Sequence, residues 1–99
     1  MNTIKLSLQI AIAEKAVELY RLEESLRSAS ADLRNACSEF RHKHNGGNYV
    51  QRDSDMHEQM REVTGLEFET YNEAKRNVRN AKRRLDTAIR ASLGKGVRP

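Results

Sequence analysis

Four side chains of types that bind zinc fall within one short stretch of this sequence. Cys37, His42 and His44 lie close together, and His57 would return to the same end of a chain that folds back between them. The C-x4-H-x-H spacing matches no standard zinc-ligand pattern, and the chain has no second cysteine. We therefore interpret the histidines as solvated side chains and Cys37 as a packing residue, and we expect no metal and no cofactor.

The residue types of a nucleophilic triad are also present, in Asp53, Ser54 and His57. They occur where a helix is expected to begin, and short polar side chains serve as caps at such positions. A working triad needs a cleft, an oxyanion hole and an orienting network. Gly94-Lys95-Gly96 likewise lacks the strand and the upstream glycine of a phosphate-binding loop. We predict no catalytic residues, no small-molecule substrate and no enzymatic activity.

Apolar residues repeat every seven positions through the first half of the chain, and this repeat indicates which secondary structure holds the side chains discussed above. This stripe consists of Ile12, Leu19, Leu26, Leu33 and Phe40, with companions at Leu8, Lys15, Leu22, Ala29 and Ala36. An average spacing of about 3.5 residues is typical of a helix that packs lengthwise on another helix. The second half carries a matching stripe of smaller residues, namely Met60, Thr64, Glu67, Tyr71, Ala74, Val78, Ala81, Leu85, Ala88 and Ser92.

The predicted fold is therefore all-α, a single domain formed by a long antiparallel two-helix hairpin that resembles a coiled coil. Apolar residues make up only 37% of the chain and aromatic residues 5%, which suits a narrow helix seam better than a globular core. The expected elements are a helix at about 3–41, a loop at 42–53, a second helix at about 54–93 and a frayed tail at 94–99. Gly65 favours a break inside the second helix, because glycine costs roughly 1 kcal/mol relative to alanine there.

Charged residues beside the stripe favour this register. A chain that folds back near residue 50 places Glu18 opposite Arg84 and Glu23 opposite Lys75. Antiparallel coiled coils use pairs at these positions. Each exposed pair contributes roughly 0.2–1 kcal/mol, so the pairs select the orientation of the helices more than they stabilise them.

A second apolar row lies on the face of the first helix opposite the stripe. It consists of Leu6, Ile10, Ala13, Val17 and Tyr20. A two-helix hairpin buries only one face of each helix, and an exposed apolar row usually marks an interface. We predict an oligomer or partner interface at this row, and a homodimer forming a four-helix bundle is the simplest closed assembly. The alternative is that a kinked or swapped helix covers the row.

Positive charge is concentrated at the end of the chain. Residues 72–99 contain nine Lys/Arg against two Asp/Glu, whereas residues 1–71 contain nine against twelve. One outward stripe of the second helix holds Lys75, Arg76, Arg79, Lys82, Arg83 and Arg90. Such a face attracts phosphates or an acidic protein surface. Glutamates of the first helix return beside it and no aromatic residue interrupts it, which favours a protein partner over a nucleic acid.

We interpret the chain as a non-enzymatic helical protein that self-associates and binds another macromolecule, with a protein as the leading class of partner. The alternative is that the basic stripe binds the backbone of DNA or RNA. A third hypothesis is an accessory inhibitor of a host nucleic-acid enzyme, of the type that mobile elements encode. The single cysteine favours a reducing compartment, and no apolar run approaches the ~20 residues of a membrane span, so we expect a cytoplasmic protein without a membrane partner.

Overall fold

The chain folds into three helices, and the computed structural model describes residues 3–97. The helices are α1 (Thr3–Asn45), α2 (Asp55–Val63) and α3 (Gly65–Val97). The described residues contain no strand, so the prediction of an all-α fold is confirmed. α3 continues through the expected end near residue 93, and residues 98–99 of the expected frayed tail lie outside the described part of the chain.

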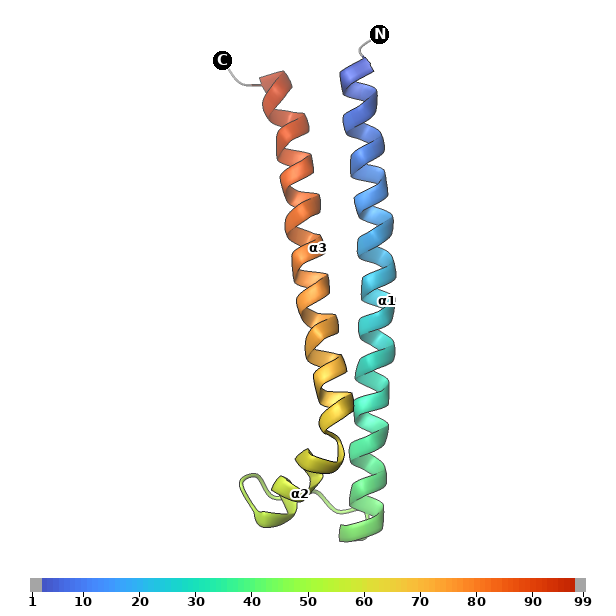
Figure 1. The fold of residues 1–99 in the computed structure, drawn as a ribbon, viewed down its shortest axis with the longest axis vertical. Helices are drawn as coiled ribbons and strands as arrows, with labels where there is room; N and C mark the ends of the chain where they lie inside the picture. Colours follow the sequence, from blue (N-terminus) through green and yellow to red (C-terminus); the bar gives the residue numbers. More distant parts are fainter. Residues whose placement is uncertain (1–2, 98–99) are drawn as a thin grey trace.

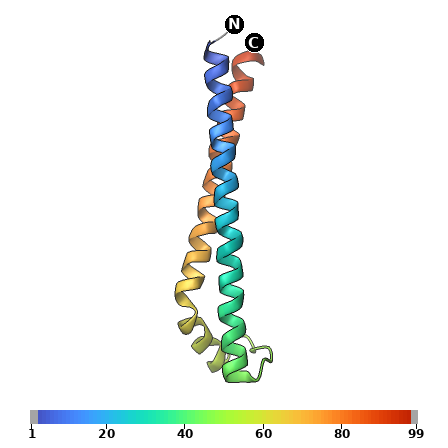
Figure 2. The same cartoon turned by 90° about the vertical axis from the view of Figure 1, so that its right-hand side faces the viewer.

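α1 and α3 lie side by side and antiparallel, with the loop at one end of the molecule (Figure 1). The perpendicular view shows the same two helices following each other along most of their length (Figure 2). The structure measures 66 × 22 × 18 Å and has a radius of gyration of 20.7 Å. A compact domain of this length has a radius of gyration of about 13 Å. The molecule is therefore an extended helix pair.

The seam between α1 and α3 follows the heptad stripe. Every stripe residue from Leu8 to Phe40 is buried or half-buried, and so is every residue of the matching stripe from Met60 to Ser92. The most deeply buried residues of the two stripes are Phe40, Thr64, Ala29, Val78 and Ala81, at 2–6% exposure. Small residues facing large ones let two helices approach without leaving voids.

One of the two predicted ion pairs between the helices is present. Arg84 Nη2 donates to Glu18 Oε1 at 2.7 Å, which confirms that prediction. The other prediction, an ion pair between Glu23 and Lys75, is wrong. The Lys75 ammonium lies 5.1 Å from the centroid of the Tyr71 ring on its own helix, and it makes no ion pair with any described residue. A cation–π contact four residues away is available without bridging two helices.

The loop begins where two glycines adopt the left-handed conformation. Gly46 has a φ of 59° and Gly47 a φ of 82°, values that other residues rarely adopt. Asn45 Nδ2 donates to the carbonyl oxygens of Asn48 and Tyr49, at 3.2 and 3.1 Å. α1 therefore extends beyond its expected end, because no residue before Gly46 interrupts the helical hydrogen bonds.

α2 begins with Ser54 as its N-cap. Ser54 Oγ accepts a hydrogen bond from the backbone N–H of His57 at 3.1 Å and donates to the carbonyl of Gln51 at 2.7 Å. These bonds satisfy a helix N–H that has no partner inside the helix. The contact between Ser54 and the backbone of His57, two of the residues considered for a triad, is therefore the N-cap of α2.

The chain bends at Thr64, between α2 and α3. The Thr64 N–H and Oγ1 both donate to the carbonyl of Met60, at 2.9 and 2.7 Å, and the Phe68 N–H donates to the carbonyl of Thr64 at 2.9 Å. The hydroxyl competes for a carbonyl of the helix ladder, which bends helices. α2 consequently turns out of the line of α3 (Figure 1).

Among the described residues, no helix combines the length and the apolar composition that a bilayer crossing requires.

Replacement of Ala81 by Leu is expected to lower the free energy of unfolding by about 1–3 kcal/mol, because a well-packed seam has no room for three more carbons. Ala81 is 2% exposed. Urea denaturation followed by far-UV circular dichroism measures the change. Ala91→Leu is the matched control, since Ala91 is exposed and should shift stability by less than about 0.5 kcal/mol. Equal losses in the two variants would contradict a tightly packed seam.

Candidate functional site

Most of the predicted basic stripe lines one groove beside the seam. Its lining consists of Lys75, Arg76, Arg79, Lys82 and Arg83, with Asn72 and Val78 of α3 and Leu26 of α1. We call the five basic residues the groove cations. The groove is open and has a volume of about 700 Å³. Leu26 and Val78 were predicted as seam residues but not as part of the basic face, and Asn72 was not predicted, because a groove formed by two helices is not visible in the pattern of one of them.

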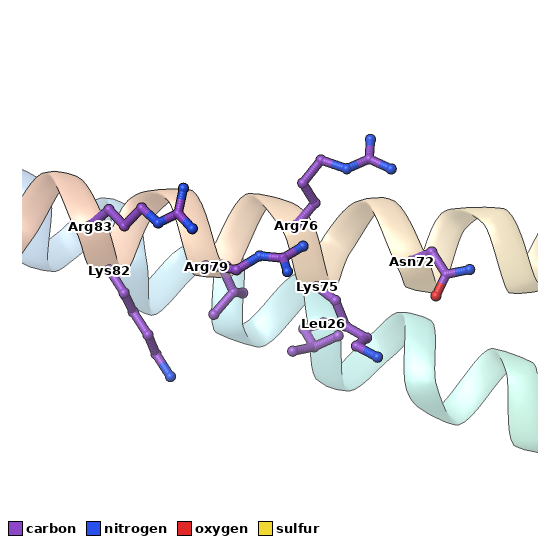
Figure 3. A pocket seen from close by; sticks show the side chains of 8 residues that line it. Leu26, Asn72, Lys75, Arg76, Arg79, Lys82 and Arg83 are labelled. Carbon is purple, nitrogen blue, oxygen red and sulfur yellow. The ribbon is translucent and has the colours of Figure 1, made fainter.

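Helical spacing explains why the groove cations share a face. Residues three, four and seven apart stand above one another on a helix. Figure 3 shows Lys75 and Lys82 extending toward α1, Arg76 and Arg83 on the other side, and Arg79 between them. Leu26 is half-buried and Val78 buried, so apolar atoms lie between and beneath the charged groups.

Arg90 does not join the groove. Its Nε lies 3.0 Å from Asp86 Oδ2, one helical turn earlier on α3. The structure therefore brings together five of the six residues of the basic stripe and leaves Arg90 beside a carboxylate of its own helix.

No described residue forms an ion pair with a groove cation. The glutamates of α1 were expected to lie beside this face, but two of them are engaged elsewhere. Glu18 binds Arg84, and Glu24 accepts a hydrogen bond from Arg27. That hydrogen bond, together with the charge of Glu24, raises the pKa of Arg27 above its ordinary value. The positive charge of the groove is therefore available to a ligand.

The second apolar row of α1 is exposed to solvent. Leu6, Ile10, Val17 and Tyr20 are 42%, 51%, 50% and 62% exposed, and Ala13 is exposed as well. No described segment of the chain covers them, which excludes a covering helix within the described residues. Side chains of these sizes at these exposures present on the order of 400 Å² of apolar surface, the size of patch that often marks an interface.

Another exposed apolar group, not predicted from the sequence, lies at the bend. Val63, Leu66 and Phe68 are 67%, 74% and 46% exposed. A second groove of about 410 Å³ is lined by Glu58, Arg61, Glu62, Thr64, Gly65, Phe68 and Glu69. The signal in the sequence is that Val63, Leu66 and Phe68 fall outside the heptad stripe on both sides of Gly65.

The four residues weighed as zinc ligands do not gather. Cys37 and His57 line one groove of about 270 Å³ at the loop end of the molecule. The His44 ring lies 4.5 Å from a phenylalanine ring on the preceding turn of α1. The His42 ring packs against Gly47, where an added Cβ would meet it at 2.9 Å. Within the described residues, no three His, Cys, Asp or Glu side chains are placed to hold a metal ion.

Comparisons of the chain with protein-family models, with curated proteins and with solved structures find no match. The groove, the apolar row and the bend are the features from which a function must be inferred.

Replacement of Arg79 by Gln is expected to raise the free energy of unfolding at low salt by about 0.2–1 kcal/mol, because the other four groove cations lie three or four residues away and repel it. Gln and Arg have similar helix propensities, so the charge is the main change. Thermal denaturation at low and high salt tests this, and the gain should vanish when salt screens the repulsion. Arg84→Gln is the matched control and should lose stability, because it breaks the pair with Glu18. A loss of stability in Arg79→Gln at low salt would show that the groove charge is compensated within the chain.

Proposed function

We propose that this chain is a non-enzymatic binding protein whose groove on α3 docks an acidic protein surface. The observation that carries this proposal is a set of five cations around one groove, none of which is paired with a described residue. A focused field of one sign attracts a ligand of the opposite sign and raises its association rate. Three of the five are arginines, whose guanidinium groups can bind carboxylates through two parallel hydrogen bonds.

The apolar atoms of the groove favour a protein over a nucleic acid. Leu26 and Val78 line the same groove as the cations, and a groove with both apolar and basic lining is complementary to a helix carrying both apolar and acidic side chains. Sites for single-stranded nucleic acids supply aromatic side chains on which bases stack. The nearby aromatic residue, Tyr71, is half-buried and carries Lys75 over its ring.

Binding to the backbone of DNA or RNA is the second candidate function, and the unpaired charge favours it too. The groove cations span about 12 Å of α3 at 1.5 Å per residue, enough to contact several phosphates of one backbone. No observation among the described residues bears on the hypothesis of an accessory inhibitor.

We further propose that the apolar row of α1 contacts the same row of a second copy, which gives a dimeric four-helix assembly. Two rows together would bury about 800 Å² of apolar surface, less than the roughly 1,200–2,000 Å² of stable interfaces, so the dimer depends on protein concentration. The cytoplasm is the compartment that we propose, because a reducing environment keeps Cys37 as a free thiol.

Reversal of Arg79 and Arg83 to Glu should weaken the binding of fluorescein-labelled poly-L-glutamate at least about tenfold, since hydrogen bonds to charged groups contribute roughly 1.5–3 kcal/mol each. Fluorescence anisotropy measures the affinity. The matched control reverses Arg34 and Arg90, which are exposed and lie outside the groove, so that the net charge changes equally.

If both double variants lose the same affinity, binding follows net charge and the groove is not the site. A labelled DNA duplex is the second probe. Tighter binding to the duplex, lost in the Arg79 and Arg83 variant alone, would replace the acidic-protein function by the nucleic-acid function.

Replacement of Ile10 and Val17 by Asp should convert a dimer into a monomer, because four carboxylates would enter an apolar contact without partners. Light scattering on the eluting protein gives the mass. Ser25→Asp with Ser28→Asp adds the same charge at exposed positions of α1 outside the row and should leave the mass unchanged. A dimer that survives the Ile10 and Val17 replacements would show that the row is not its contact.

A further inference from the structure

The charges of α2 and α3 fall into two separate blocks of opposite sign. Residues 53–73 contain seven Asp/Glu and one Arg, whereas residues 75–90 contain seven Lys/Arg and one Asp. The first block covers α2, the bend and the start of α3, and the second covers the groove. Successive parts of the chain, from α2 through α3, thus carry charges of equal size and opposite sign.

Most charges of both blocks form no ion pair with a described residue. The acids Glu58, Glu62, Glu69 and Glu73 are exposed and form no ion pair with a described residue. In the basic block only Arg84 and Arg90 form pairs, and neither of them lines the groove. An acidic surface and a basic surface therefore lie next to each other, and neither has its charges compensated by ion pairs with described residues.

The two surfaces also share a face of α3. Phe68 and Glu69 line the groove at the bend, and Asn72, Lys75 and Arg76 line the basic groove. Steps of three and four residues keep side chains on one side of a helix. The groove at the bend, which we call the acidic bend, therefore lies next to the groove of Figure 3 along α3, with Asn72 three residues after Glu69.

We propose that this face binds the same face of a second copy in antiparallel orientation, so that each acidic bend lies against the basic groove of the other copy. A two-fold axis crossing α3 near Asn72 generates the contact. It places Glu69 opposite Arg76 of the second copy, and it places Glu62 opposite that copy's Arg83. Glu62 and Glu69 line the same groove at the bend, and Arg76 and Arg83 line the same basic groove, so one contact brings both pairs together. This inference rests on the proposed function, since it names the acidic surface that the groove takes.

Charge complementarity selects both the occupant and its orientation. A parallel arrangement of two copies would set acid against acid and base against base, which costs several kcal/mol and disfavours the wrong register. The antiparallel arrangement repeats the same contact on both sides of the axis, so this contact by itself joins two copies as a closed pair. It also covers the exposed parts of Phe68 and Leu66 with the aliphatic stems of the arginines.

The test uses the full chain and two reversal variants. Arg76→Glu with Arg83→Glu reverses the two basic partners of the proposed pairs, and Glu62→Arg with Glu69→Arg reverses the two acidic partners. We expect wild-type protein to gain mass at low salt in multiples of the 11.4 kDa chain and to lose this gain at high salt. Each variant alone should show no salt-dependent gain. An equimolar mixture of the two variants should regain it, because a contact between one copy of each variant again sets opposite charges against each other in both pairs.

Sedimentation velocity at low and high salt measures the association, with far-UV circular dichroism as the check on folding. The apolar contact proposed for α1 does not weaken with salt, so the salt-dependent step reports the α3 face. A wild-type mass that is independent of salt would overturn the inference. So would variants that associate as the wild type does, or a mixture of folded variants that fails to associate.

Failure of this inference and failure of the proposed function give different results. The Glu62 and Glu69 variant keeps the groove cations, so it should bind poly-L-glutamate at least as tightly as the wild type while losing the salt-dependent association. Wild-type protein that binds poly-L-glutamate through Arg79 and Arg83, yet shows no such association, would overturn the self-contact and leave the proposed function standing. If the wild-type protein neither binds poly-L-glutamate nor associates at low salt, the inference and the proposed function are both overturned.

Discussion

The contact between small residues of α3 and large residues of α1 is the interaction on which the rest of the structure depends. Ala81 on α3 and Ala29 on α1 are nearly inaccessible to solvent, which shows how closely the two helices approach. Such close approach gains dispersion contacts along the length of the seam. Among the described residues, α2 contacts α1 and α3 only at the loop end, so the faces of α1 and α3 outside the seam are exposed along most of their length.

The bend is where this seam is weakest. Glu67 occupies a seam position, and its Oε2 is buried without a hydrogen-bond partner in the described structure. A buried unsatisfied oxygen costs about 1–3 kcal/mol, and the flexible Gly65 lies two residues away. Thr64 bends the chain at the same point, and Val63, Leu66 and Phe68 become exposed there. An unsatisfied seam carboxylate and an outward apolar surface thus occur at the same point of the chain.

The sequence predicts well what periodicity determines. The stripe from Leu8 to Phe40 gives the buried face, and the register that it implies correctly pairs Glu18 with Arg84. It predicts poorly the contacts for which several partners compete locally around one side chain. Lys75 contacts the Tyr71 ring of its own helix in preference to Glu23, and the two side-chain bonds from Asn45 to the loop help to set the end of α1.

The candidate functional site likewise has a part that the sequence predicts and a part that it does not. The basic residues follow from helical spacing, but the groove needs Leu26, which is distant in sequence and is brought to α3 by the hairpin. The exposed group at the bend was missed because its members fall outside the heptad stripe, which itself continues through the bend from Met60 to Tyr71. The pairing of Arg90 with Asp86 depends on the rotamers of two exposed side chains, which spacing alone does not fix.

A seam only one side chain wide also determines how the molecule opens. Each layer of the hairpin contacts only the layers next to it, so the stability is distributed along one dimension, as in repeat proteins. Breathing motions then start at the two ends and move inward, and amide hydrogens near the ends exchange with solvent before those in the middle. Leu26 and Val78 lie close to the midpoints of α1 and α3. The groove therefore occupies the slowest-exchanging part of the hairpin, and it keeps its shape while both ends open and close.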